Sequence, residues 1–63
     1  MNRILAVNLR DQRLRAEMSQ ETLARILRVS PSVIAAWEDG TAEPDREQLV
    51  RISQALGIRI EDL

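Results

Sequence analysis

Apolar residues recur along the chain three or four positions apart, and short polar segments separate these runs. Such a period predicts helices with one buried face, because residues i, i+3 and i+4 lie on the same side of an α-helix. No segment alternates apolar and polar residues for long enough to form a sheet. Start and stop signals predict four helices, over residues 3–16, 20–27, 31–39 and 45–56, and the first turn of a fifth over residues 58–63.

Capping residues mark the predicted helix starts. Ser19 and Ser30 are placed to cap the second and third helices, and Pro31 stands at a first helical position, where its missing N–H costs nothing. Asp45, with Gln48 three residues later, is an acidic variant of the capping box. The stops of the third and fourth helices are expected at Gly40 and Gly57.

The apolar positions of each helix predict its buried face. For the first helix, with Asn2 as a candidate cap, they are Ile4, Val7 or Leu9, and Leu14. For the second helix they are Leu23, Ala24 and Leu27, and for the fourth Leu49, Ile52, Ser53 and Leu56. Trp37 is the only aromatic residue, and we expect it in the core because a lone aromatic ring cannot build a stacking groove for bases.

The second and third predicted helices are short, and only three residues separate them. So tight a connection forces the two helices to cross sharply, which predicts a helix-turn-helix. With 63 residues, 44% apolar and 30% charged, the chain is expected to fold as one compact all-α domain of four to five helices over residues 1–63.

The residue inventory excludes much chemistry. Cysteine and histidine are both absent, which removes disulfides, thiol catalysis, the usual zinc ligands and the commonest general acid or base. The acidic residues lack the spacing of a calcium loop. We therefore expect no enzyme activity, cofactor, metal or small-molecule substrate. No apolar run is long enough to cross a bilayer and no signal peptide is recognisable, so a cytoplasmic protein without a membrane partner is expected.

Charge is distributed unevenly. Residues 1–28 carry six arginines against three acids, a sum of +3, whereas residues 29–63 carry three arginines against seven acids, a sum of −4. All nine basic residues are arginines, whose planar guanidinium suits phosphate. The net charge of −1 permits nucleic-acid binding without arguing strongly for it.

In order and spacing, the chain resembles the phage-repressor/Cro type of helix-turn-helix, also called the XRE or lambda-repressor-like domain. The residues that carry the resemblance span most of the chain: Arg13, Ser19-Gln20-Glu21-Thr22-Leu23-Ala24, Val29-Ser30, Ile34, Trp37-Glu38, Gly40, Pro44, Gln54-Ala55-Leu56-Gly57-Ile58 and Glu61-Asp62-Leu63. The resemblance implies sequence-specific binding of double-stranded DNA, of the transcription-regulator type, with the helix over residues 31–39 in the major groove.

The resemblance also implies roles for individual residues. Residues that meet base edges would be Pro31, Ser32, Ala35 and Ala36. Residues that meet phosphates would be Gln20, Arg28, Ser30, Thr41 and Arg46, and among the arginines of the first helix Arg10 is the best candidate. Arg13 and Glu38 would form an ion pair that joins the first helix to the end of the third and sets its angle of presentation.

The chain departs from the family pattern at three places. Arg28 stands where glycine is common, so a left-handed backbone there would strain the chain by roughly 1 kcal/mol. Only Ser32 among the expected base-contacting residues is polar, so few side-chain groups are available to distinguish one base pair from another. Four acids surround the loop that should approach the DNA backbone and would repel phosphate: Asp39, Glu43, Asp45 and Glu47.

These departures leave other interpretations open. The same fold could serve as a protein-interaction domain of an antitoxin-like or scaffold kind, holding a partner on the acidic face of the fourth helix and on residues 58–63. The near-ideal capping is also compatible with an engineered member of the family. A lone module of this size would bind DNA modestly, so a homodimer or a second module is expected.

Overall fold

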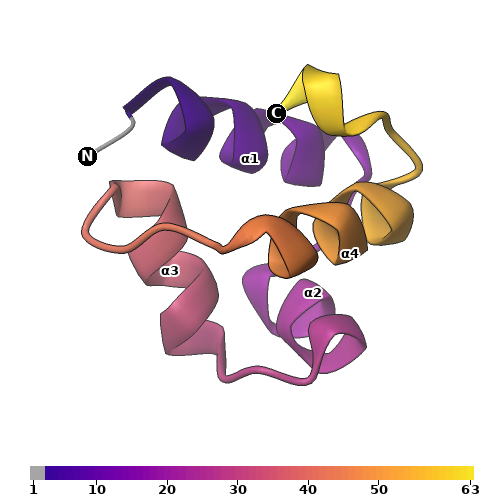
Figure 1. Ribbon diagram of the computed structural model, residues 1–63. Helices are drawn as coiled ribbons and strands as arrows, with labels where there is room; N and C mark the ends of the chain where they lie inside the picture. The colour runs from indigo at the N-terminus through magenta and orange to yellow at the C-terminus, as the bar shows by residue number, and fades with distance from the viewer. Residues whose placement is uncertain (1–2) are drawn as a thin grey trace.

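Four α-helices and one short 3₁₀ turn make up the computed structural model, which describes residues 3–63 (Figure 1). The elements are α1 (Arg3–Arg15), α2 (Gln20–Leu27), α3 (Pro31–Asp39), α4 (Arg46–Leu56) and η1 (Ile60–Asp62). The all-α prediction is confirmed, and the expected start of a fifth helix is the 3₁₀ turn. Asn2, the candidate cap of the first helix, lies outside the described residues. None of the helices within residues 3–63 is both long and apolar enough to span a membrane.

The core draws on every helix. The side chains of Leu9, Leu23, Ile34 and Ile52, one from each helix, are fully buried. In Figure 1, α1 runs along the top, α2 and α3 lie below it, and α4 crosses the middle. Helix α3 packs against both α1 and α2, while α4 packs against α2 and η1. Trp37 is buried in this core, as the sequence predicts.

The predicted inward face of the first helix is right at Leu9, which is fully buried, and wrong at its other positions. Ile4, Val7 and Leu14 are 73%, 55% and 53% exposed. Leu9 is buried together with Ala6 and Arg13, and the three residues lie at i, i+3 and i+7 along one stripe. The pattern of large apolar residues does not predict this whole stripe, because Ala6 is small and Arg13 is charged.

The helix starts agree with the capping signals at two of three places. The Ser19 hydroxyl accepts a hydrogen bond from the backbone N–H of Thr22 at 3.0 Å. Asp45 and Gln48 form both bonds of the capping box, at 2.8 and 2.9 Å. Ser30 occupies the cap position of α3 but its side chain makes no capping bond, so the prediction that its hydroxyl caps this helix is wrong. Its Oγ lies 2.8 Å from that of Ser32, so that the two hydroxyls are bonded to each other.

All four helices end in the same way, with a left-handed residue followed by a backbone bond that reaches back five positions, the Schellman motif. The bonds, between 3.0 and 3.2 Å, run from the amides of Met18, Val29, Thr41 and Ile58 to the carbonyls of Arg13, Ala24, Ala36 and Ser53, respectively. The left-handed residues are Glu17, Arg28, Gly40 and Gly57, with φ of 57°, 59°, 81° and 68°. Two helices therefore end on residues that have a Cβ in a conformation that suits glycine.

Replacing Arg28 by glycine is expected to stabilise the domain. Because Arg28 has φ 59° and ψ 45°, glycine relieves the contact between Cβ and backbone and raises the free energy of unfolding by about 1 kcal/mol. Urea denaturation measures the change. Arg28→Ala is the matched control, since it removes the same guanidinium and keeps the Cβ. An equal gain from alanine would show that the side chain, and not the backbone, is responsible.

Replacing Trp37 by alanine is expected to cost about 3 to 5 kcal/mol, because it empties the largest side-chain volume of the core. In a domain of this size such a loss abolishes the folded state. Thermal melting followed by circular dichroism checks this. A melting temperature equal to that of the unaltered protein would show that the ring contributes nothing to the core.

Candidate nucleic-acid interface

Three residues, 28–30, connect α2 to α3. Within this turn, Val29 packs against the core and its amide bonds to the carbonyl of Ala24. Arg28 and Ser30 on either side are exposed. Val29 therefore anchors the turn to the core, which fixes the angle between α2 and α3 and leaves the side chains of Arg28 and Ser30 at the surface.

Helix α3 presents a small, weakly polar face. Its inward residues, Ile34 and Trp37, are buried. On the other side Pro31 and Ser32 are exposed, whereas Ala35 is half-buried. Ala36, the fourth residue expected to meet bases, is also half-buried. The expected base-contacting residues therefore lie at or near the surface, and none of them belongs to the buried core.

A bidentate ion pair holds the end of α3 against α1. Arg13 donates from Nε to Glu38 Oε2 at 2.6 Å and from Nη2 to Oε1 at 3.0 Å. The two side chains are only 8% and 5% exposed. Hydrogen bonding to Glu38, the main cause, raises the pKa of Arg13 above its ordinary value. The guanidinium is therefore permanently charged and geometrically fixed.

Two further bonds extend this pair. Arg13 Nη1 donates to the carbonyl of Met18 at 2.6 Å, which ties the turn between α1 and α2 to the pair. Gln20 donates from Nε2 to Glu38 Oε1 at 3.1 Å. Gln20 is also the first residue of α2, where backbone N–H groups have no partner within the helix. The pair thus sets how α3 and the start of α2 lie relative to each other.

Breaking the pair from one side is expected to be costly. Arg13→Ala leaves the Glu38 carboxylate buried without its cation and should lower the free energy of unfolding by about 3 to 5 kcal/mol. Arg10→Ala is the matched control, because Arg10 is an exposed arginine of the same helix, and its loss should change stability by less than about 0.5 kcal/mol. Urea denaturation of both variants checks this, and similar losses for the two would refute a special role of the pair.

Helices α1, α2 and α3 together form a groove of about 310 Å³ beside this pair. Its lining residues are Arg10, Arg13, Gln20, Ala35, Glu38 and Asp39. The groove unites Arg10 and Gln20, expected to meet phosphates, with Ala35, expected to meet bases. Its two arginines and two carboxylates cancel, so the lining as a whole has no net charge.

The remaining expected phosphate contacts lie at the surface outside this groove. Arg28, Ser30, Thr41 and Arg46 are all exposed. Thr41 is nevertheless engaged, because Asp39 Oδ1 accepts from its backbone N–H at 2.9 Å and from its hydroxyl at 2.6 Å. These bonds lower the pKa of Asp39 below its ordinary value, the hydroxyl bond most strongly. The sequence predicts only that Asp39 repels phosphate, and its bonds to Thr41 are visible only in the structure.

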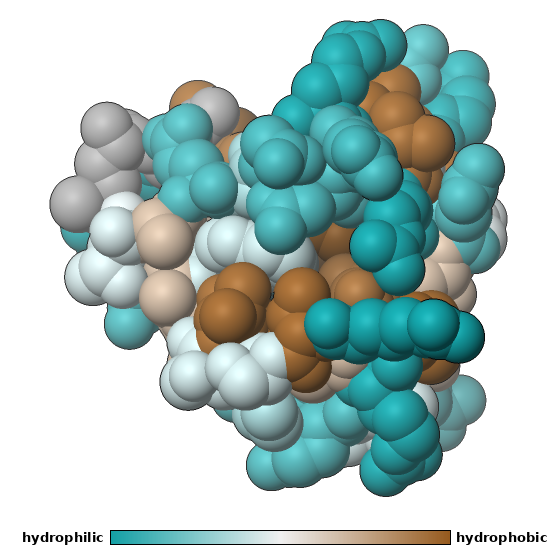
Figure 2. Space-filling view, turned by 60° about the horizontal axis from the view of Figure 1, so that its bottom comes forward, coloured by the Kyte–Doolittle hydropathy of each residue, from teal (hydrophilic) through white to brown (hydrophobic). Residues whose placement is uncertain are grey.

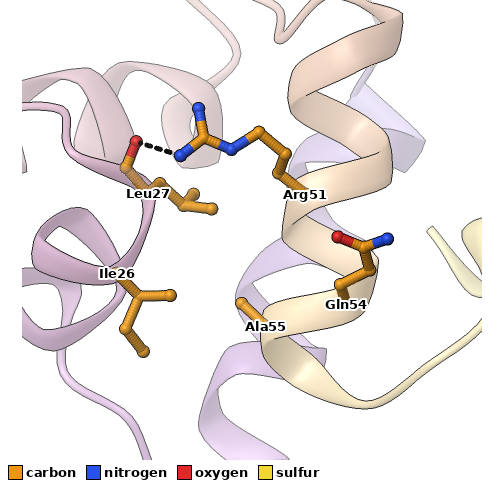
Figure 3. A pocket seen from close by; sticks show the side chains of 5 residues that line it. All are labelled: Ile26, Leu27, Arg51, Gln54 and Ala55. Atoms are coloured by element: carbon orange, nitrogen blue, oxygen red, sulfur yellow. Dashed lines mark hydrogen bonds between the residues drawn. The ribbon is translucent and has the colours of Figure 1, made fainter.

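A second groove, of about 280 Å³, lies between α2 and α4 (Figure 3). Ile26 and Ala55 line it, and Arg51 reaches across from α4 to donate to the carbonyl of Leu27 at 3.1 Å. Sequence reasoning gave Arg51 no role. The signal that could have found it is that the last carbonyls of a helix such as α2 lack partners and attract donors.

The surface is mixed in character. In the view that brings the lower side of Figure 1 forward, apolar atoms show between hydrophilic side chains (Figure 2). On α2 and α4 the exposed large apolar residues are Ile26 and Val50, at 47% and 37%. Within residues 3–63, no three acidic side chains come together as they would to hold a metal ion.

Comparison with protein-family models matches residues 9–63 to the helix-turn-helix family HTH_3. Curated protein sequences give no match. Among solved structures, ClgR, the clp gene regulator from Corynebacterium glutamicum, is 32% identical with a TM-score of 0.91, over 95% of this chain and 64% of that one. HppE in its Fe(II) form with substrate is 35% identical with a TM-score of 0.90, over 98% and 36%. Hydroxypropylphosphonic acid epoxidase from S. wedmorenis is 37% identical with a TM-score of 0.85, over 92% and 31%.

The fold and the crossing of α2 and α3 define a helix-turn-helix domain of the DNA-binding, transcription-regulator type. The chain belongs to the HTH_3 family, the XRE or lambda-repressor-like group. It spans 36% of the HppE chain, so that most of that protein has no counterpart here. The family match and the likeness to ClgR point to DNA binding rather than to catalysis.

Proposed function

We propose that this domain binds double-stranded DNA sequence-specifically, with α3 in the major groove. The observation that carries the proposal is the presentation of α3. Ile34 and Trp37 anchor the helix in the core, while Pro31 and Ser32 are exposed on its first turn. The first turn of a recognition helix is where family members meet base edges. Base contacts are assigned to Pro31, Ser32, Ala35 and Ala36.

Phosphate contacts are assigned to the residues around this helix: Arg10, Gln20, Arg28, Ser30, Thr41 and Arg46. The start of α2 supports the assignment, because its free N–H groups and the positive end of the helix dipole attract an anion. Gln20 is held there by Glu38. Arg28 and Ser30 lie in the turn that leads into α3, and both are exposed.

Sequence readout by this face is limited to a few positions. Ser32 is the polar member among the four residues assigned to base edges, and serine bonds to donors and acceptors alike. Alanine methyl groups add contact with the methyl group of thymine. A second copy or second module on neighbouring DNA would supply the affinity and length of site that one such face lacks.

Titration of selected duplex DNA at two salt concentrations tests the proposal. The three arginines among these contacts would give a slope of log affinity against log salt of about −2.7. Gln20→Ala is expected to weaken binding without changing this slope, because glutamine carries no charge. Arg28→Ala is expected to weaken binding and to flatten the slope by about 0.9. Ser32→Ala is expected to relax preference at one or two base pairs, because it removes the polar group assigned to a base edge, and to leave the melting temperature unchanged.

Arg59→Ala is the matched control, since Arg59 is an exposed arginine next to η1, outside the assigned contacts. Its removal should leave the affinity nearly unchanged. An equal loss with Arg59→Ala would mean that the arginines attract DNA without a defined site. Unaltered selectivity with Ser32→Ala would contradict the assignment of α3 to the major groove.

The second groove favours one other candidate, a protein-interaction domain. Ile26, which lines this groove, is exposed, and Val50 is a second exposed apolar residue on α4. Residues 58–63 were expected to contact such a partner, but Ile58 and Leu63 pack against the core of the domain itself. A protein-binding role would accordingly use the face between α2 and α4. In the titration above it would show as weak, sequence-independent binding that Gln20→Ala does not alter.

A further inference from the structure

Asp39 occupies a central place in the proposed interface. It is the last residue of α3, and it lines the groove that Arg10 and Gln20 also line. One of its carboxylate oxygens accepts from both the backbone N–H and the hydroxyl of Thr41, at 2.9 and 2.6 Å. Those two donors are the groups through which Thr41 would hold a phosphate. A single carboxylate oxygen therefore accepts from both donors of Thr41, and the backbone N–H is shared with the carbonyl of Ala36.

The electrostatic setting of Asp39 differs from that of the neighbouring acid. Glu38 is neutralised by the two bonds from Arg13. Within residues 3–63, Asp39 has no ion pair, and Thr41 is its bonding partner. Because the groove lining sums to zero with Asp39 present, it would sum to +1 without it. Since Glu38 pairs with Arg13, Asp39 is the acid that offsets the charge of Arg10 in this groove.

We infer that Asp39 limits the DNA affinity of this domain by acting as an internal competitor for phosphate at Thr41. The inference rests on the proposed function. A DNA phosphate and the Asp39 carboxylate are both anions that accept hydrogen bonds, so they compete for the one hydroxyl proton of Thr41. Binding at this loop therefore requires the Asp39 carboxylate to turn away from Thr41, and the free protein is stabilised against that change.

The protonation state of Asp39 fits this role. Bonds from Thr41 lower the pKa of the carboxyl group, so it is ionised at neutral pH. An ionised carboxylate accepts stronger hydrogen bonds than a neutral one and repels phosphate at the same time. Competition and repulsion thus act in the same direction, and both end when the carboxylate is removed.

Affinity measurements on a matched set of variants test the inference. Asp39→Ala is expected to tighten binding of the selected duplex about tenfold, because it releases the Thr41 hydroxyl from the carboxylate and removes a repelling charge. Glu43→Ala removes another exposed carboxylate, from the loop that follows α3. Its gain should stay near twofold, since exposed charges are largely screened by salt. Asp39→Asn, which keeps an acceptor oxygen for Thr41, should fall between the two.

Thr41→Val separates competition from simple repulsion. It removes the hydroxyl donor and keeps the backbone N–H, so the gain from Asp39→Ala should shrink in a Thr41→Val background. A gain of the same size in that background, or an equal gain from Glu43→Ala, would overturn the competitor role. Salt-dependent binding of the unaltered protein with no change in Asp39→Ala would overturn this inference alone. Absence of salt-dependent binding in every variant would overturn the proposed function and this inference with it.

Discussion

The bidentate pair between Arg13 and Glu38 is the constraint on which the presentation of α3 depends. Four helices can pack round an apolar core at many angles, because dispersion and hydrophobic burial are not directional. A guanidinium facing a carboxylate permits one geometry. Since Arg13 also holds the carbonyl of Met18 and Glu38 also holds Gln20, this geometry is transmitted to the start of α2. The two elements assigned to DNA are thereby oriented by one buried pair, at a cost in desolvation that well-packed apolar residues would avoid.

A related compromise is visible at the helix ends. The four Schellman motifs give a backbone partner to a carbonyl in the last turn of each helix and bring Met18, Val29 and Ile58 back onto the core. At Arg28 the motif is formed by a residue with a Cβ, next to the proposed recognition helix. Arg28 is the arginine closest in sequence to α3, and its backbone is strained. Strain at this position fits a residue that serves DNA contact rather than stability.

Much of the fold could be predicted because its signals are local. Ser19 and Pro31 predicted the starts of α2 and α3, and Gly40 and Gly57 predicted the ends of α3 and α4, since each signal acts within one turn of the chain. On α1 the local pattern indicated Leu9 but not the buried Arg13, because burying Arg13 depends on Glu38, twenty-five positions away. The same limit explains the site. The sequence shows that Asp39 and Thr41 are near each other, but not that one carboxylate oxygen takes both donors, because that depends on the left-handed turn at Gly40 between them.

Each helix gives the core one fully enclosed aliphatic side chain, Leu9, Leu23, Ile34 or Ile52. Removing any single element would open the remaining three to water. The smallest part that keeps this core intact is consequently the whole four-helix domain. A peptide containing just α2 and α3 would retain the residues assigned to DNA but lose the scaffold that orders them, so transplanting this recognition surface into another protein means transplanting the domain entire.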